Sequence, residues 1–170
     1  GTYDIEVIHT ASALTHAHER SKMACGIYSF VLWELLNKPA KESIIRGLSK
    51  AKRYYHDWDE MKSYYKMLFR RIGLTEFHFE DPDTFERAKR DEIKSTGYVV
   101  DTIEAAIWCL MNTYSYKECV LMAVNLGDDT DTVAAIAGGL AGALYGYDSI
   151  PEEWRNTLIK REYIEELCER

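Results

Sequence analysis

The sequence has few prolines and no excess of positive charge. Only three prolines occur in 170 residues, Pro39, Pro82 and Pro151, and each lies where the helical periodicity of the chain breaks. They therefore separate helices and do not interrupt them. The formal net charge is −7, and basic residues with interleaved aromatics form no stripe. This pattern argues against a nucleic-acid-binding surface, so we expect no nucleic acid among the partners.

Long apolar runs and paired cysteines are also missing. The small-residue segment 133–146 is too short to cross a bilayer, which takes about 20 apolar residues. It also lacks the Gly-x-Gly-x-x-Gly order of a dinucleotide-binding loop. The four cysteines contain no Cys-x-x-Cys pair, so we expect reduced thiols in a cytoplasmic protein with no membrane-spanning segment. Without a Gly-x-Ser-x-Gly elbow or a Ser-His-Asp order, an acyl-transfer hydrolase is not supported.

What the sequence has instead is helical periodicity along most of its length. Apolar residues recur three and four positions apart, and no segment alternates as a strand would. We expect helices over residues 23–36, 41–58, 64–72, 85–94, 102–112, 116–124 and 132–145, and a loop over residues 75–84. The content of 46% hydrophobic and 29% charged residues is that of an ordinary globular domain. The sequence therefore predicts one all-α domain over residues 1–170.

The most informative segment is an acidic turn that precedes the last of these helices. Residues 125–132 read Asn-Leu-Gly-Asp-Asp-Thr-Asp-Thr. Carboxylates this close repel one another unless the positive end of the following helix or a bound cation offsets their charge. One interpretation is therefore a helix cap. The other is a metal site, in which Asp129, Asp131 and Thr132 supply the hard oxygen ligands that suit Mg²⁺, Mn²⁺ or Ca²⁺. The spacing lacks the Gly and Glu positions of an EF-hand.

The helix after this turn carries a stripe of small residues. Ala134, Gly138, Gly142 and Gly146 recur at intervals of four. Each interior glycine costs roughly 1 kcal/mol relative to alanine. We therefore expect another backbone to approach the stripe closely, as in a central, tightly packed helix.

Residues 125–146 resemble the C-terminal signature of the ADP-ribosylglycohydrolase family, in which Gly-Gly-Asp-x-Asp-Thr precedes a small-residue helix that ends in Tyr-Gly. Asp128 stands here where the second glycine is usual. Residues 95–111 resemble the family's Gly-Tyr-Val helix start, and residues 11–16 resemble its Thr-His segment. The resemblance covers nearly the whole chain. It implies a compact multi-helix fold and a metal-dependent hydrolase that releases ADP-ribose from a modified protein or small molecule.

The resemblance also implies roles for single residues. The three ligand candidates of the acidic turn would bind Mg²⁺ or Mn²⁺, with two ions in the complete enzyme. His16 would face bound ADP-ribose, and Tyr98 would border it. Judged by residue type alone, His16 and His18 could instead be surface residues or share a zinc ion, and Tyr98 could be an ordinary core residue.

Members of the family carry a second metal-binding segment, Gly-Asp-Asp-Thr, and a catalytic acidic residue well upstream of the Thr-His segment. Thr15 and His16 stand close to residue 1 here, so we expect this chain to supply the C-terminal half of an incomplete site. A missing N-terminal half or a second copy would then complete it, and the isolated chain would have little or no activity. The alternative is a non-catalytic helical fragment, or one half of a pseudoenzyme, that binds a partner chain.

Overall fold

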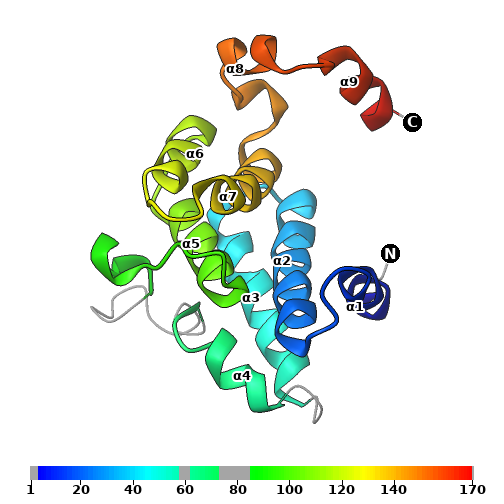
Figure 1. Cartoon of the computed structure of the whole chain (residues 1–170), viewed down its shortest axis with the longest axis vertical. Coiled ribbons are helices and arrows are strands. Elements are labelled where there is room, and N and C mark those ends of the chain that lie inside the picture. The colour runs from blue at the N-terminus through cyan, green and yellow to red at the C-terminus, as the bar shows by residue number, and fades with distance from the viewer. Residues whose placement is uncertain (1–3, 58–61, 73–84, 170) are drawn as a thin grey trace.

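The computed structural model describes residues 4–57, 62–72 and 85–169, and every regular element within these ranges is a helix. The predicted all-α fold is thereby confirmed. The first part contains α1 (Ile5–Ala13), α2 (Glu19–Asn37), α3 (Lys41–His56) and α4 (Lys62–Leu68) (Figure 1). The second contains the short 3₁₀ turns η3 (Phe85–Arg87) and η4 (Arg90–Glu92), then α5 (Val99–Met111), α6 (Tyr116–Val124), α7 (Thr130–Tyr145), η5 (Tyr147–Ser149), α8 (Glu152–Thr157) and α9 (Arg161–Glu169).

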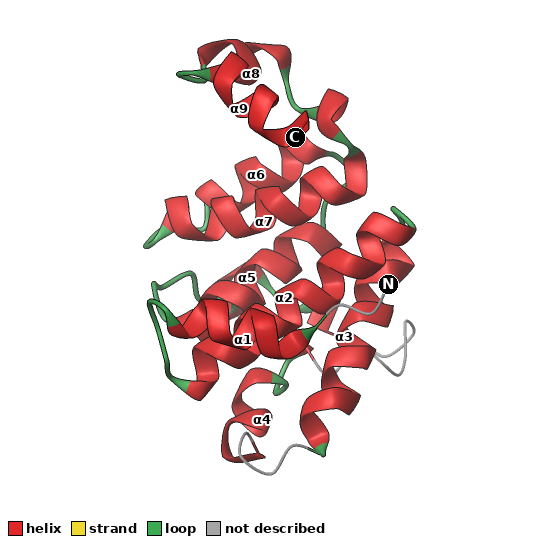
Figure 2. Cartoon of the chain, turned by 90° about the vertical axis from the view of Figure 1, so that its right-hand side faces the viewer, coloured by secondary structure: helices red, strands yellow, loops and turns green. Residues whose placement is uncertain are grey.

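Three helices, α2, α5 and α7, contact one another at the centre of the fold. Their fully buried side chains include Ile27 of α2, Ile107 of α5 and Leu140 of α7. Around this centre, α1 and α3 pack on α2, and α6 packs on α7. Figure 2 shows α6 and α7 stacked above α5, with α4 below it. The prediction that residues 132–145 form a central helix is confirmed.

The prediction of a close backbone along the small-residue stripe of α7 is wrong. A Cβ added at Gly138 would meet only side-chain atoms, Tyr116 Oη at 3.4 Å and Val120 Cγ2 at 3.5 Å. At Gly142 a Cβ would meet no described atom within 4 Å. Gly146 has a positive φ of 84° at the end of α7, which favours glycine for conformational reasons.

The close backbone approach lies instead between α2 and α3. A Cβ added at Gly47 would lie 2.5 Å from Val31 Cα and 2.9 Å from Phe30 O. Ion pairs reinforce the same contact, since Glu34 accepts from Arg46 at 3.2 Å and from Lys50 at 2.5 Å. Only a residue without a side chain lets these two helices pack this closely.

The helix expected over residues 85–94 is absent, and η3 and η4 take its place. Glu92 accepts a hydrogen bond from the backbone N–H of Lys89 at 2.7 Å, which closes a single short turn. The indole N–H of Trp108 donates to the carbonyl of Ala88 at 3.0 Å. This carbonyl is therefore paired with a side chain of α5 and not with a backbone N–H of its own helix. Tertiary hydrogen bonds thus replace the helix that the pattern indicates. The loop predicted over residues 75–84 lies outside the described residues.

The two C-terminal helices, α8 and α9, were not predicted and project from the body in Figure 1. Neither contains a buried residue. In the described part of the chain, no helix combines the length and the apolar character that crossing a bilayer requires.

Candidate functional site

The acidic turn before α7 is built on two residues with a positive φ. Gly127 has φ 90° and Asp128 has φ 54°. Left-handed backbone suits glycine and is tolerated by Asp and Asn, whose short polar side chains hydrogen-bond locally. In the family signature this position holds a second glycine, and its backbone conformation favours glycine. Aspartate is among the few other residue types that tolerate this conformation, so Asp128 can occupy the position.

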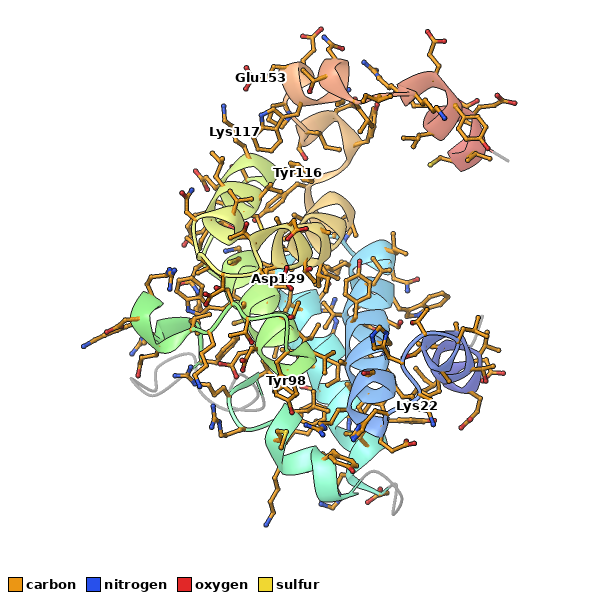
Figure 3. All side chains as sticks on the ribbon, in the orientation of Figure 1. Lys22, Tyr98, Tyr116, Lys117, Asp129 and Glu153 are labelled. Atoms are coloured by element: carbon orange, nitrogen blue, oxygen red, sulfur yellow. The ribbon has the colours of Figure 1, made fainter. Side chains whose placement is uncertain are left out.

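The turn is tied to the segment that precedes α5. The backbone N–H of Asp129 donates to the carbonyl of Ser95 at 3.0 Å, and the hydroxyl of Ser95 donates to the carbonyl of Gly127 at 2.8 Å. Ser95 is buried, so these two bonds are shielded from water. They hold the N-terminal ends of α5 and α7 side by side, with Asp129 at the junction (Figure 3).

The carboxylate of Asp129 does not cap its helix. Asp129 occupies the N-cap position of α7, yet its side chain accepts no capping hydrogen bond from the first turn. Its Oδ1 accepts from the hydroxyl of Thr132 at 2.8 Å. Its Oδ2 lies 2.8 Å from the place that a Cβ on Gly97 would occupy, so the carboxylate fills the space left by this glycine. The structure thus brings together Asp129, Thr132 and Gly97.

The donor set at this turn suits a hard cation. Asp129 is half-buried, while Asp131 and Thr132 lie exposed in the first turn of α7. Carboxylate and hydroxyl oxygens are the ligands that Mg²⁺ and Mn²⁺ prefer. Within the ranges that the structure describes, no three His, Cys, Asp or Glu side chains gather as a group that could hold a metal. Asp129, Asp131 and Thr132 thus have the oxygen donors that a hard cation takes, without a complete set of ligands among the described residues.

His16 lies exposed in the short connection between α1 and α2. Its Nδ1 is 3.1 Å from the hydroxyl of Thr15, and its backbone N–H donates to the carbonyl of Ser12 at 2.9 Å. His18 instead caps α2, because its Nδ1 accepts from the backbone N–H of Arg20 at 3.1 Å. In the described part of the chain the two imidazoles belong to no group of metal ligands, so the zinc interpretation gains no support.

Tyr98 is not a core residue. It stands immediately before α5 and is 38% exposed. Its hydroxyl accepts from the guanidinium of Arg20 at 2.5 Å and donates to the sulfur of Met67 at 2.9 Å. Arg20 also lies 5.5 Å from the ring centroids of both Tyr64 and Tyr98. Sequence reasoning missed Arg20, since no spacing in the sequence links residues 20, 64 and 98.

An apolar cavity of about 490 Å³ lies between α1, α2, α5 and α7. Its walls include Ile8, Tyr28, Val99 and Ile136. Burial raises the pKa of the Tyr28 hydroxyl. Val99 directly follows Tyr98, so the cavity adjoins the segment that carries the candidate substrate residue.

Two known proteins are similar to this chain in sequence. The chain is 37% identical over 159 residues to an ADP-ribosylarginine hydrolase, Tri1, of Serratia proteamaculans (strain 568), and the match covers 94% of the chain and 38% of that relative. It is 43% identical over 72 residues to the ADP-ribosyl-[dinitrogen reductase] glycohydrolase of Rhodospirillum rubrum, covering 41% of the chain and 24% of the relative. The chain thus spans well under half the length of these relatives.

A solved structure described as an ADP-ribosylglycohydrolase-related protein complex has a similar fold. It superposes with a TM-score of 0.71 at 29% sequence identity, over 96% of this chain and 50% of the other. The sequence profile of the ADP-ribosylglycohydrolases matches residues 4–170. The profile covers nearly the whole chain and the fold agrees with it, so the chain belongs to the ADP-ribosylglycohydrolase family.

Proposed function

We propose that this chain forms the C-terminal part of the active site of a metal-dependent ADP-ribosyl hydrolase, an enzyme that releases ADP-ribose from a modified protein or small molecule. Family membership supports the reaction class, because relatives of this chain are named as hydrolases of ADP-ribosylarginine and of ADP-ribosylated dinitrogen reductase. A second polypeptide segment or chain would supply the catalytic acidic residue.

The observation that carries the proposal is the orientation of the Asp129 carboxylate. An Asp at an N-cap position ordinarily accepts from a backbone N–H of its own helix, whereas Asp129 makes no such bond. Its Oδ1 accepts from the Thr132 hydroxyl and its Oδ2 faces Gly97. A carboxylate held by a neighbouring hydroxyl and not used as a cap is suited to binding a cation.

In the complete enzyme Asp129, Asp131 and Thr132 would hold Mg²⁺ or Mn²⁺, two ions in all, from the side of α7. Bound there, the metal would supply Lewis-acid activation of water and orientation of the ribose hydroxyls beside the anomeric carbon. Glycosidic cleavage passes through a transition state like an oxocarbenium ion. His16 and Tyr98 would bind the ADP-ribosyl group outside the metal ligands.

Calorimetric titration with ADP-ribose, in the presence and absence of Mg²⁺, tests this proposal. We expect Mg²⁺-dependent binding that Asp129→Asn weakens at least about tenfold, since the substitution removes one charged ligand. Gly97→Ala should weaken it as well, because its Cβ would displace Oδ2 of Asp129. Gly142→Ala is the matched control, since its Cβ enters open space. Binding that is independent of Mg²⁺ and unchanged in Asp129→Asn would refute the metal role.

We also propose that the isolated chain has little or no hydrolase activity, since it carries only part of the site. Incubation with ADP-ribosylated arginine and quantification of released ADP-ribose tests this directly. Turnover that depends on Asp129 would show that the chain is catalytically sufficient, contrary to this proposal.

A second candidate function is the binding of a partner chain without catalysis. The apolar side chains of α9 support it, because Tyr163, Ile164 and Leu167 are 59%, 41% and 49% exposed on one face of the helix. Light scattering across a concentration series is the test. A dimer that Ile164→Glu dissociates would favour this function, and a monomer at all concentrations would count against self-association.

A further inference from the structure

Arg20 is a half-buried cation that has no acidic partner among the residues that the structure describes. Its guanidinium is held by aromatic rings instead, 5.5 Å from the centroids of Tyr64 and Tyr98. The hydroxyl of Tyr98 accepts one of its N–H groups at 2.5 Å. A guanidinium fixed in this way presents a rigid set of donors.

The contact between Arg20 and His18 points to a missing acceptor. The backbone N–H of Arg20 donates to Nδ1 of His18 at 3.1 Å, and a backbone N–H cannot accept. His18 Nδ1 is therefore the acceptor, so the ring proton of His18 is on Nε2. That Nε2 lies 3.2 Å from the Nη2 of Arg20, which also carries only protons. With the proton on Nε2, two donors lie side by side, and an anionic oxygen next to both nitrogens would accept from both.

This pair of donors adjoins the acidic turn through Tyr98. Gly97, the residue before Tyr98, faces Oδ2 of Asp129, while the hydroxyl of Tyr98 contacts Arg20. In Figure 3 Tyr98 lies below Asp129, toward the end of the molecule that holds α4. A ligand whose ribose reached the acidic turn could extend its anionic part past Tyr98 toward Arg20.

We infer that Arg20 and His18 bind the diphosphate of the ADP-ribosyl substrate, and that Tyr64 and Tyr98 position the guanidinium for this contact. The inference rests on the proposed function, because it applies only if the ligand is an ADP-ribosyl group whose ribose lies at Asp129. The planar fork of arginine matches the oxygens of a phosphate group, and the Nε2–H of His18 adds a further donor on the same side.

The test is a calorimetric measurement of ADP-ribose and adenosine binding to the wild-type chain, Arg20→Met and Arg20→Lys in the presence of Mg²⁺. Circular dichroism of each variant establishes that it is folded. Lys117→Met is the control for loss of positive charge, because Lys117 lies exposed on α6, far from Tyr98 in Figure 3. The ³¹P chemical shift of bound ADP-ribose reports the phosphate environment directly.

We expect Arg20→Met to weaken ADP-ribose binding about tenfold to a hundredfold, as loss of a charge-assisted hydrogen bond does. The bound ³¹P shift should move toward the free value, adenosine affinity should stay constant, and Lys117→Met should bind like the wild type. Arg20→Lys, which keeps the charge without the fork, should show an intermediate loss.

If the Arg20 variants bind ADP-ribose like the wild type, or lose adenosine affinity equally, the inference is wrong while the proposed function stands. If the wild type binds no ADP-ribose, both fail.

Discussion

Asp128 shows how one backbone angle can determine which residues a signature allows. It holds φ 54° directly before the N-cap position of α7, and its side chain is exposed. Glycine reaches this conformation without strain, and Asp reaches it more readily than other residues with a Cβ. The change from the family's glycine therefore alters the charge beside the candidate metal ligands and leaves the turn intact.

We predict that Asp128→Ala is less stable than Asp128→Gly by about 1 kcal/mol, the usual cost of left-handed backbone for a residue with a Cβ. Urea denaturation followed by circular dichroism measures the difference. Equal midpoints for the two variants would show that the turn relaxes to another conformation.

His9 is a buried titratable group outside the candidate site. It is 5% exposed, and its Nε2 lies 2.7 Å from the hydroxyl of Tyr55. Burial is the main cause that lowers the pKa of this imidazole. The folded protein therefore takes up a proton here less readily than the unfolded chain does.

The pH dependence of stability follows from that difference. As the pH falls below about 6.5, the ordinary pKa of histidine, the unfolded chain binds a proton that folded His9 does not, so the free energy of unfolding decreases. We predict that His9→Gln flattens the profile between pH 7 and pH 5 in a series of urea titrations. A wild-type profile that rises toward acid pH would contradict this assignment.

Two glycines in different helices have opposite roles. Gly47 in α3 faces the backbone of α2, whereas Gly142 in α7 faces open space. The first is required by the distance between two helices, and the second only lowers the stability of its own helix. A glycine in a helical sequence pattern does not reveal which of these roles it has.

We predict that Gly47→Ala destabilises the fold by about 1–3 kcal/mol, since its Cβ would overlap Val31 Cα and force α2 and α3 apart. Gly142→Ala should stabilise it by about 1 kcal/mol through helix propensity. Thermal unfolding of both variants measures the two effects. Similar shifts in the same direction would show that the α2–α3 contact adjusts freely.

The whole molecule divides into a packed body and a projecting C-terminal extension. The body is organised around α2, α5 and α7, and α8 and α9 contribute no buried residue to it (Figure 2). The extension is tied down by polar and ring contacts, such as Lys117 with Glu153 at 3.4 Å and Tyr116 with Trp154 at 6.3 Å between ring centroids. Exposed ion pairs of this kind contribute little to stability.

We predict that hydrogen exchange separates these two parts. Backbone amides of α8 and α9 should exchange by local opening, while those of α5 and α7 should exchange only through global unfolding. Mass spectrometry of peptides from each helix measures the rates. Equal protection of α9 and α7 would mean that a partner, such as a second copy, covers the extension in solution.

Much of the fold follows from local pattern. The periodicity of residues 41–58 and 116–124 predicts α3 and α6 closely, since amphipathic helices are specified by their own sequence. The acidic turn is also evident from the sequence, because three carboxylates in four residues repel one another unless something offsets their charge. Residues 85–94 were wrongly predicted as a helix, because contacts from α5 to that segment override its propensity.

The sequence by itself determined the all-α class, the position of α7 behind an acidic turn, and a family resemblance that the sequence profile bears out. Only the tertiary structure decided what the side chains at the site contact. Asp129 contacts Gly97, and Arg20 contacts Tyr64 and Tyr98. These residues lie far apart in the sequence, so no local pattern predicts that they are neighbours. The physical reason is that helical periodicity encodes which face of a segment is buried, whereas pairing between distant helix ends depends on how all the buried faces pack together.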